Sequence, residues 1–362
     1  MTETQINLMD VLRTRARNQP QTTAYTFINE TTQESLTYQE LLIKVEHMAS
    51  TLQTMGTAGS RALLLLPPGL DYIITFYGCL MAGIIAVPAY PPRGNRHAQR
   101  IAAIIDDAQA ELILTTANVA EQYQFQIKVL AVDEMEFTQP KKFQDHLINI
   151  QDIAFLQYTS GSTGTPKGVQ VTHANIMANT RAIHTLFEER MESICSWVPP
   201  FHDMGLIGAI LYPLACGLHS ILMAPTTFLK KPFIWLKAIS DYQVMLAPAP
   251  NFSYDICATT ITAEEKKQLD LSHWVVALNG AEPVSAKTLA RFSDAFKECG
   301  FHAEHCYPAY GMAETTLMVS GKAPQTKTTI AYVDKQVLQN QGQLRFLDEE
   351  DADATAIVGC GY

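Results

Sequence analysis

The segment YTSGSTGTPKG, from Tyr158 to Gly168, is strongly biased in composition and sets the expectations for the rest of the chain. It combines three glycines with five serines and threonines, one proline and one lysine. Glycine allows positive φ and close approach of the backbone to a ligand, while hydroxyls and Lys167 supply donors and a positive charge. The composition predicts a loop that holds an anionic group such as phosphate. The alternative is a flexible turn between two strands.

Two well-known loops do not fit this segment. A Walker A motif requires G-x-x-x-x-G-K-[ST], but counting from Gly161 places Pro166 at the second glycine and Gly168 at the serine or threonine. The nucleophile elbow G-x-S-x-G of hydrolases is not matched either. A P-loop NTPase is therefore disfavoured, although hydrolysis of ATP in the absence of any other substrate would support this class again.

Composition excludes other classes of protein. The 362 residues carry a formal net charge of -10, with 47% apolar and 17% charged residues, which predicts large buried cores. An acidic chain without a basic cluster is a poor nucleic-acid binder. Seven scattered cysteines form no CxxC pair, and the N-terminus has no signal-peptide core. These features predict a cytoplasmic protein with reduced cysteines.

Two apolar runs have a length that requires comparison with a membrane span. Residues 72–90, YIITFYGCLMAGIIAVPAY, are uncharged, and a second run, LIGAILYPLACGLHSILMAP, begins at Leu206. Glycine and proline interrupt both runs. Buried strands of parallel sheets read as continuous apolar segments. We therefore expect a buried helix leading into a buried strand in each case, and no integral membrane protein.

Helical and extended patterns alternate along most of the chain. A helix is expected over 37–56 and strands are expected in segments such as RALLLLPP, ELILTT, VMLAPAP and WVVALNGAE. This alternation predicts an α/β fold with parallel sheets covered by helices. We expect residues 1–150 to form a first α/β part, 151–320 a second part with the polar motifs, and 321–362 a tail of different composition. In such sheets ligands bind at the carboxyl ends of the strands, where the polar motifs occur.

Four further motifs follow the loop in order: PPFHDMGL (199–206), APAPNF (247–252), NGAEPV (279–284) and YGMAETT (310–316). Together with the loop they make the chain resemble the adenylate-forming superfamily, which includes acyl-CoA synthetases, luciferases, peptide-synthetase adenylation domains and fatty acyl-AMP ligases. Its members activate a carboxylate with ATP, giving an acyl adenylate and pyrophosphate, and pass the acyl group to a thiol. The resemblance implies ATP and Mg²⁺ as cofactors. It also implies two stacked parallel-sheet αβα subdomains.

The resemblance assigns roles to individual residues. Lys167 would be a catalytic cation at the phosphates, and His202 would lie beside the substrate carboxylate, although a histidine in this setting taken alone is more often structural. Glu314 would bind the Mg²⁺ that bridges the phosphates, which suits a metal held by few carboxylates. The phosphates and adenine would contact the remaining cofactor-binding residues: Thr159, Ser160, Gly161, Ser162, Thr163, Gly164, Gly280, Ala281, Glu282, Pro283, Tyr310, Gly311, Met312 and Ala313.

Three features make the chain similar to the fatty acyl-AMP ligases in particular. These are the segment VPAYPPRGNRHAQRIAAIIDDAQAELILTT, the sequence around the loop and PPFHDMGL, and about three dozen residues, Lys322 to Ala356, between YGMAETTLMVSG and IVGCGY. Ala313, where many superfamily members have threonine, is also common in this branch. The branch carries an insertion between YGMAETTLMVSG and IVGCGY, which is thought to hinder use of free CoA. The acceptor would then be the phosphopantetheine thiol of an acyl carrier protein, or of a carrier domain in a polyketide or peptide synthase.

The resemblance leaves alternatives open. The substrate would be a fatty acid of medium to long chain; a long-chain acyl-CoA ligase is the nearest alternative, and a non-catalytic acyl- or nucleotide-binding module is another. For the tail, the alternative is a surface loop without regular structure. Apolar residues such as Phe201, Met204, Phe252 and Tyr254 suit an alkyl tunnel or an ordinary core equally. The family's ribose-binding Asp, and the catalytic Lys that its C-terminal domain brings to the α-phosphate, have no candidate here, so we expect binding without efficient turnover.

Overall fold

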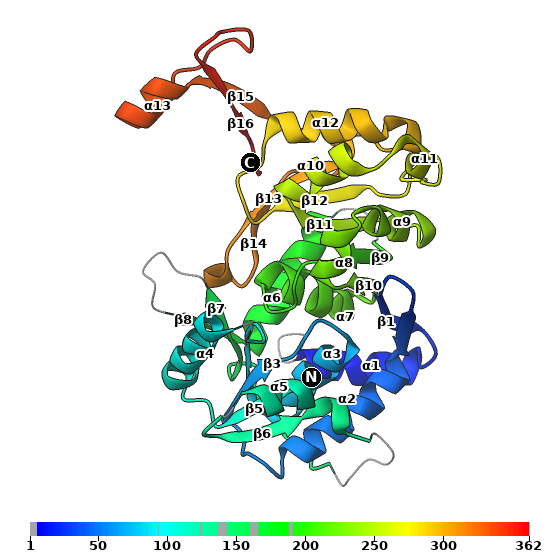
Figure 1. Cartoon of the computed structure of the whole chain (residues 1–362), viewed down its shortest axis with the longest axis vertical. Helices are drawn as coiled ribbons and strands as arrows, with labels where there is room; N and C mark the ends of the chain where they lie inside the picture. Colours follow the sequence, from blue (N-terminus) through cyan, green and yellow to red (C-terminus); the bar gives the residue numbers. More distant parts are fainter. Residues whose placement is uncertain are drawn as a thin grey trace. The chain divides into compact units, whose positions relative to one another are not determined.

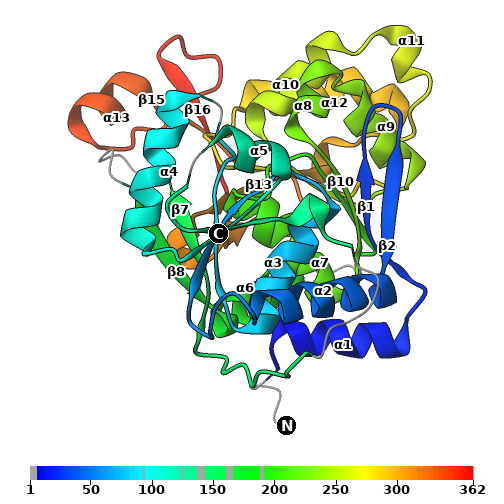
Figure 2. The same cartoon turned by 60° about the horizontal axis from the view of Figure 1, so that its bottom comes forward.

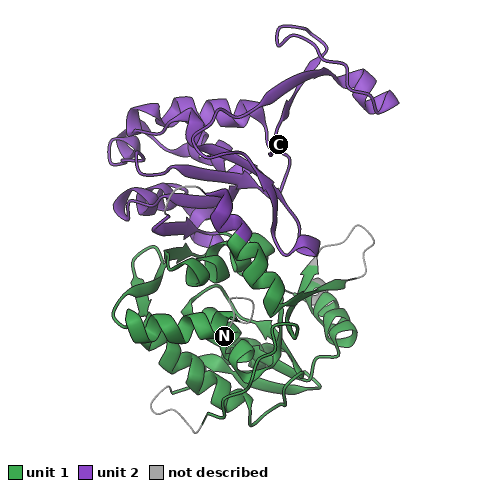
Figure 3. Ribbon diagram, turned by 180° about the vertical axis from the view of Figure 1, so that it is seen from behind, with its two compact units in different colours: residues 1–181, 198–224 green, residues 182–197, 225–362 purple. Residues whose placement is uncertain are grey.

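The computed structural model describes residues 6–92, 94–123, 125–136, 143–159, 166–187 and 191–361, apart from the side chains of Asn95, Arg96 and Thr159. The chain divides into two compact units (Figure 3). Unit 1 consists of Met1–Arg181 and Val198–Ala224, and unit 2 of Ala182–Trp197 and Pro225–Tyr362. The division at residues 150 and 320 that was expected from the sequence stays a prediction.

The main sheet of unit 1 contains six described strands in the order β6-β5-β3-β4-β7-β8 (Figure 1). Neighbouring strands pair in parallel except for β7 and β8, which are antiparallel. This arrangement confirms the α/β fold with parallel sheets. The strands are β3 (Arg61–Leu65), β4 (Ile85–Pro88), β5 (Leu112–Thr115), β6 (Lys128–Ala131), β7 (Ile153–Thr159) and β8 (Lys167–Thr172).

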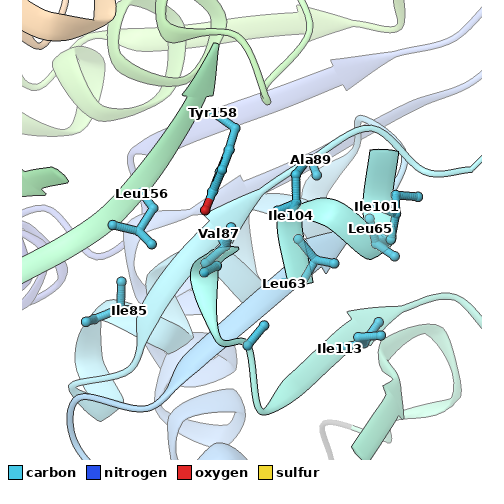
Figure 4. Close-up of a cluster of buried hydrophobic side chains, with 12 residues drawn as sticks. Leu63, Leu65, Ile85, Val87, Ala89, Ile101, Ile104, Ile113, Leu156 and Tyr158 are labelled. Carbon is cyan, nitrogen blue, oxygen red and sulfur yellow. The ribbon is translucent and has the colours of Figure 1, made fainter. Parts of the chain in front are cut away.

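Helices cover both faces of this sheet. On one face, α3 (Leu70–Ala82) places the ring of Phe76 5.7 Å from that of Phe155 on β7. On the other face, Ile101 and Ile104 of α4 (Asn95–Ala108) belong to a buried cluster that includes Leu63 and Tyr158 of the strands (Figure 4). Alternating side chains of each strand therefore enter two separate layers of core.

The remaining elements of unit 1 complete these layers. The helix α2 (Tyr38–Leu52) begins with a capping box between Thr37 and Glu40 and ends at Leu52, earlier than the expected Gly56. Figure 2 shows α1, α2 and α3 side by side. The strand β1 (Thr23–Ile28) pairs in parallel with β10 (His219–Met223) and antiparallel with β2 (Gln33–Thr37). The other elements are α1 (Leu8–Asn18), α5 (Ala117–Gln122), η2 (Val132–Glu134), the π-helix η3 (Met204–Leu211) and α7 (Tyr212–Cys216), while α6 (His173–Leu186) crosses the unit boundary.

The two long apolar runs form buried elements, as expected. The first consists of α3 followed by β4. Every side chain of α3 from Tyr72 to Ala82 is buried, and so are those of β4. The second consists of η3, α7 and β10, so a helix, a turn and a strand follow one another. Among the described residues, no helix combines the length and the apolar character needed to cross a membrane.

The sheet of unit 2 is built on four described parallel strands in the order β9-β11-β12-β13, with β14 antiparallel beside β13. Aromatic side chains fill its core: the ring of Trp274 lies 5.4 Å from Trp235 and 5.8 Å from Phe292. The strands are β9 (Ser193–Ser196), β11 (Leu246–Pro250), β12 (Val276–Gly280), β13 (Cys306–Gly311) and β14 (Met318–Gly321). The helices are α8 (Pro225–Lys230), α9 (Phe233–Asp241), α10 (Asn251–Thr260), α11 (Ala263–Lys266), α12 (Ala286–Phe296) and the short turns η4 (Lys297–Cys299), η5 (Ala303–His305) and η6 (Ala313–Thr315).

The tail of the chain has regular structure. The strands β15 (Ile330–Asp334) and β16 (Ala354–Val358) pair antiparallel, and α13 (Lys335–Gln341) lies between them in the sequence. Figures 1 and 3 show this hairpin reaching away from the rest of unit 2. The alternative of a surface loop without regular structure was therefore wrong for the described residues. All seven cysteines are free.

Candidate functional site

The predicted site residues belong to two groups. Lys167 and His202 are in unit 1, and the predicted residues from Gly280 to Glu314 are in unit 2. The loop between β7 and β8 was predicted to bind phosphate, but Ser160, Gly161, Ser162, Thr163 and Gly164 lie outside the described residues. Thr159 is described as the last residue of β7, without its side chain.

Lys167 is the first residue of β8 and is exposed to solvent. It lies opposite Thr159 in the antiparallel pairing of β7 with β8, and Gly168 lies opposite Tyr158. Because side chains alternate along a strand, Lys167 and Tyr158 project from opposite faces of this strand pair. The strand pairing therefore sets both the position and the direction of this cation.

His202 lies in the turn before η3, which β7 and α3 hold in place. The side-chain amide of Gln157, the residue before Tyr158 on β7, donates to the carbonyl of Phe201 at 2.9 Å. The hydroxyl of Tyr72 donates to the carbonyl of Pro200 at 2.8 Å. Both supporting side chains are buried. Strand β7 thus supports the turn of His202 through Gln157 as well as pairing with the strand of Lys167.

The imidazole of His202 forms a pair with the neighbouring carboxylate of Asp203. The Nδ1 atom of His202 lies 2.7 Å from Oδ1 of Asp203, which also accepts the backbone N–H of Met204 at 2.7 Å. Burial by itself lowers the pKa of His202, but the hydrogen bond and charge of Asp203 raise it above the ordinary value. With Nδ1 donating to Asp203, the Nε2 atom is left for a substrate.

In unit 2, the segment from Gly280 to Pro283 begins at the last residue of β12. Ala281 has a φ of 65°, in the left-handed region that non-glycine residues seldom adopt. The residues from Ala281 to Pro283 are exposed, while Asn279 before them is fully buried. An unusual backbone conformation that is held at the carboxyl end of a parallel strand is typical of ligand-binding turns.

A network of hydrogen bonds holds this segment against the start of α10. The carboxylate of Glu282 accepts the backbone N–H of Phe252 at 2.7 Å, where a negative charge also interacts favourably with the helix dipole. The side-chain oxygen of Asn251 accepts from the amide of Asn279 at 3.2 Å and from the backbone N–H of Ser285 at 3.1 Å. Glu282 therefore holds the turn against the start of α10, and its predicted place at the rim of an adenine site stays a prediction.

The segment from Tyr310 to Glu314 lies at the same edge of the unit 2 sheet. Strands β12 and β13 pair in parallel, so their carboxyl ends are adjacent. Tyr310 is 51% exposed, which leaves its ring available for stacking. A Cβ atom on Gly311 would lie 2.2 Å from the carbonyl oxygen of Leu317, so only glycine allows this turn. Ala313 is buried and Glu314 is exposed.

The residues considered for an alkyl tunnel are mostly core. Tyr254 is fully buried, its ring lies 5.0 Å from Phe292, and its hydroxyl donates to the carbonyl of Leu278 at 2.9 Å. Phe201 and Met204 are also buried, whereas Phe252 is 40% exposed. Among the described residues, no group of three or more His, Cys, Asp and Glu side chains is placed to hold a metal ion.

The chain was compared with known protein families and solved structures. Residues 12–352 match the model of a family described as AMP-binding enzyme. The chain belongs to this family. Among relatives of this AMP-binding enzyme are a medium-chain-fatty-acid–[acyl-carrier-protein] ligase, JamA, of Moorena producens, 38% identical, and a second such ligase, TtuA, of Teredinibacter turnerae, 31% identical. The matches cover 98% and 96% of this chain, and 63% and 61% of those proteins.

Solved structures show the same fold. A fatty acid AMP ligase from Legionella pneumophila superposes with a TM-score of 0.94 at 41% identity, covering 98% of this chain and 63% of that chain. A structure of a fatty acyl-adenylate ligase from the same organism holds acyl adenylate and pyrophosphate, with a TM-score of 0.93 and the same identity and coverage. The resemblance to adenylate-forming enzymes is confirmed. The chain spans slightly less than two thirds of the length of these relatives.

Several residues that shape the site were not predicted. Asn251 and Asn279 were inside quoted motifs without a role, yet their side chains join two strand ends. Gln157 lies two positions before the predicted Thr159, and Asp203 directly follows the predicted His202; both support the turn of His202. The sequence signal for Gln157 and Asn279 is a polar residue inside an otherwise apolar strand, because buried amides require partners.

Proposed function

We propose that this AMP-binding enzyme activates a fatty acid with ATP, giving acyl adenylate and pyrophosphate, and then transfers the acyl group to the phosphopantetheine thiol of a carrier protein. The observation that supports this most directly is the similarity over 98% of the chain to a fatty-acid–acyl-carrier-protein ligase and to an acyl-adenylate ligase. The substrate is a fatty acid of medium to long chain. The carrier is a free acyl carrier protein or a domain of a larger synthase.

In the first step, a carboxylate oxygen of the fatty acid attacks the α-phosphorus of ATP, and the bond to the leaving pyrophosphate breaks. Lys167 offers an exposed cation to the phosphates, and the loop before it supplies hydroxyls. His202, with its Nδ1 directed to Asp203, presents Nε2 to the carboxylate. These groups stabilise the charge that develops on the departing pyrophosphate and orient the nucleophile.

The unit 2 residues suit the adenosine part of the substrate. The exposed ring of Tyr310 offers a face for adenine, and the turn from Gly280 to Pro283 offers backbone groups at the adjacent strand end. Glu314 is an exposed carboxylate in the same segment, as expected for a residue that would hold Mg²⁺ together with phosphate oxygens and water.

In the second step, the thiolate attacks the acyl carbonyl, and AMP leaves. One observation supports a different acceptor: relatives that are 32% identical are named putative fatty-acid–CoA ligases. Free CoA is therefore the alternative acceptor to a carrier protein. Both carry the same phosphopantetheine thiol, so the chemistry at the carbonyl is identical and only the recognition of the carrier differs.

The test measures pyrophosphate release and acyl transfer by the protein expressed from its complete coding sequence. Pyrophosphate should appear only when both ATP and a fatty acid are present. Lys167→Ala and Glu314→Ala should each slow its release about 10²-fold, the typical effect of losing one electrostatic contact in the transition state. Lys230→Ala serves as a control, since Lys230 is an exposed lysine outside the motifs.

Transfer is then followed with holo acyl carrier protein and with free CoA at equal concentrations. The proposal expects thioester to form on the carrier protein and little on CoA. Equal rates with the two thiols would favour the CoA ligase. Unchanged pyrophosphate release in Lys167→Ala or Glu314→Ala would reject the role given to that residue, and release without any fatty acid would reject the function.

A further inference from the structure

The aromatic ring of Tyr158 covers Gly168 on the neighbouring strand. The two residues lie opposite each other in the pairing of β7 with β8, one position before Thr159 and one after Lys167. A Cβ atom on Gly168 would lie 2.9 Å from Cζ of Tyr158 and 3.1 Å from its hydroxyl oxygen. The ring therefore occupies the space that a side chain at position 168 would need. Tyr158 thus fixes β8 next to the point where Lys167 begins it.

The hydroxyl of Tyr158 is held by Asp107, near the end of α4. It donates to Oδ2 of Asp107 at 2.5 Å, a short bond to a charged acceptor. Burial, followed by this hydrogen bond and the charge of Asp107, raises the pKa of Tyr158 far above its ordinary value, so the hydroxyl remains protonated as a donor. The ring itself is 8% exposed and belongs to the cluster between α4 and the sheet (Figure 4).

Packing alone does not require this hydroxyl. Phenylalanine would fill the same space beside Ile104 and Val87, whereas the hydroxyl adds a polar atom at the edge of an apolar cluster. Such an atom must find a partner, and the bond to Asp107 fixes the direction of the ring over Gly168. Through this contact the helix α4 is connected to the strand pair of Lys167.

We propose that Tyr158, anchored by Asp107, is the positioning residue for Lys167. The inference rests on the proposed function, in which Lys167 binds the phosphates of ATP. Lys167 and Gln157 project from the same face of the strand pair, opposite to Tyr158, and Gln157 supports the turn of His202 from that face. A rotation or shift of β8 about Tyr158 would therefore move the cation relative to His202. Tyr158 acts on Lys167 through the pairing of β7 with β8.

The test compares Tyr158→Phe and Asp107→Asn with the control Asp106→Asn. Asp106 is the adjacent exposed carboxylate on α4, so its substitution makes the same change of charge. Affinities are measured by calorimetry, on the protein expressed from its complete coding sequence, for Mg-ATP, for pyrophosphate and for a non-hydrolysable acyl-adenylate analogue that lacks the β- and γ-phosphates. Hydrogen exchange of the amides of residues 167–169 provides a readout that requires no ligand.

Both substitutions should weaken binding of Mg-ATP and pyrophosphate about five- to tenfold, leave binding of the analogue unchanged and accelerate exchange at residues 167–169. Asp106→Asn should match the wild-type protein in all measurements. Wild-type affinity for Mg-ATP in both Tyr158→Phe and Asp107→Asn would overturn the inference, as would an equal loss in Asp106→Asn.

The proposed function is judged separately, by whether the wild-type protein binds the acyl-adenylate analogue. If it does not, the function is rejected, and the exchange rates at residues 167–169 still decide whether Tyr158 positions β8. Gly168→Ala gives an independent check, because its methyl group would displace the ring of Tyr158 from Asp107. It should reproduce the phosphate-selective loss, and wild-type affinity for Mg-ATP in this variant would count against the inference.

Discussion

At the scale of single residues, the pair formed by His202 and Asp203 combines two opposing effects. Burial disfavours the protonated imidazole, and the adjacent carboxylate favours it. The net rise of the pKa means that Asp203 is the larger influence, although the imidazole is 49% exposed and Asp203 only 14%. A mostly buried carboxylate beside a half-exposed imidazole also fixes the tautomer of the imidazole.

We therefore expect Asp203→Asn to lower the pKa of His202 below that of the wild-type protein, because burial remains while the compensating charge is lost. The pKa is measured by following the imidazole resonances of His202 by NMR during a pH titration. Asp241→Asn is the control, since Asp241 is an acidic residue of α9 that pairs with Lys237 and not with a histidine. An unchanged or higher pKa in Asp203→Asn would show that the pair does not control protonation of His202.

At the scale of elements, the alternation of helices and strands was predictable because apolar periodicity depends only on local sequence. The strand segments ELILTT, VMLAPAP and WVVALNGAE all form strands of parallel sheets, and the run from Tyr72 forms α3 and β4. The pairing of β1 with β2 was missed, since QESLT in β2 is mostly exposed and polar. The turn at Ala281 was also beyond prediction, because its positive φ depends on contacts with α10 that lie far away in the sequence.

The connection into the tail depends on a buried lysine. Lys322 follows β14, is 6% exposed and donates to the carbonyls of Glu304 at 2.8 Å and Thr326 at 2.6 Å. Its ammonium group also lies 5.6 Å from the centre of the Tyr307 ring. Burial lowers its pKa, and these acceptors provide the compensation that a buried cation requires. The side chain thus ties the turn before β15 to η5.

Lys322→Met should destabilise unit 2 by about 2 kcal/mol, because the carbonyls of Glu304 and Thr326 lose charge-assisted hydrogen bonds. Denaturant unfolding followed by tryptophan fluorescence measures this change, since Trp197, Trp235 and Trp274 all belong to unit 2. Lys327→Met is the control, as Lys327 is an exposed lysine of the same segment. If the two variants unfold at the same denaturant concentration, Lys322 has no structural role of this size.

At the scale of the whole molecule, the buried His173 makes the folding stability depend on pH. His173, at the start of α6, is 4% exposed, and its Nδ1 atom has no hydrogen-bond partner among the described residues. Burial lowers its pKa to about 4, although the charges of Asp152 and Asp10 act in the other direction. In the unfolded chain the pKa of a histidine is about 6.5, so the unfolded state binds a proton first as the pH falls.

The sign of the effect follows from this difference. Above pH 6.5 His173 is neutral in both states and imposes no penalty; between pH 6.5 and about 4 the unfolded state is favoured increasingly, and below that range the penalty is constant. From pH 7 to pH 5 the loss of folding stability from this residue amounts to about 2 kcal/mol.

His173→Gln should therefore lose less stability than the wild-type protein between pH 7 and pH 5. His184→Gln, at an exposed position of the same helix, should lose as much as the wild-type protein. Unfolding in urea followed by circular dichroism at the two pH values measures the change, and equal losses in His173→Gln and wild type would show that His173 titrates normally in the folded chain.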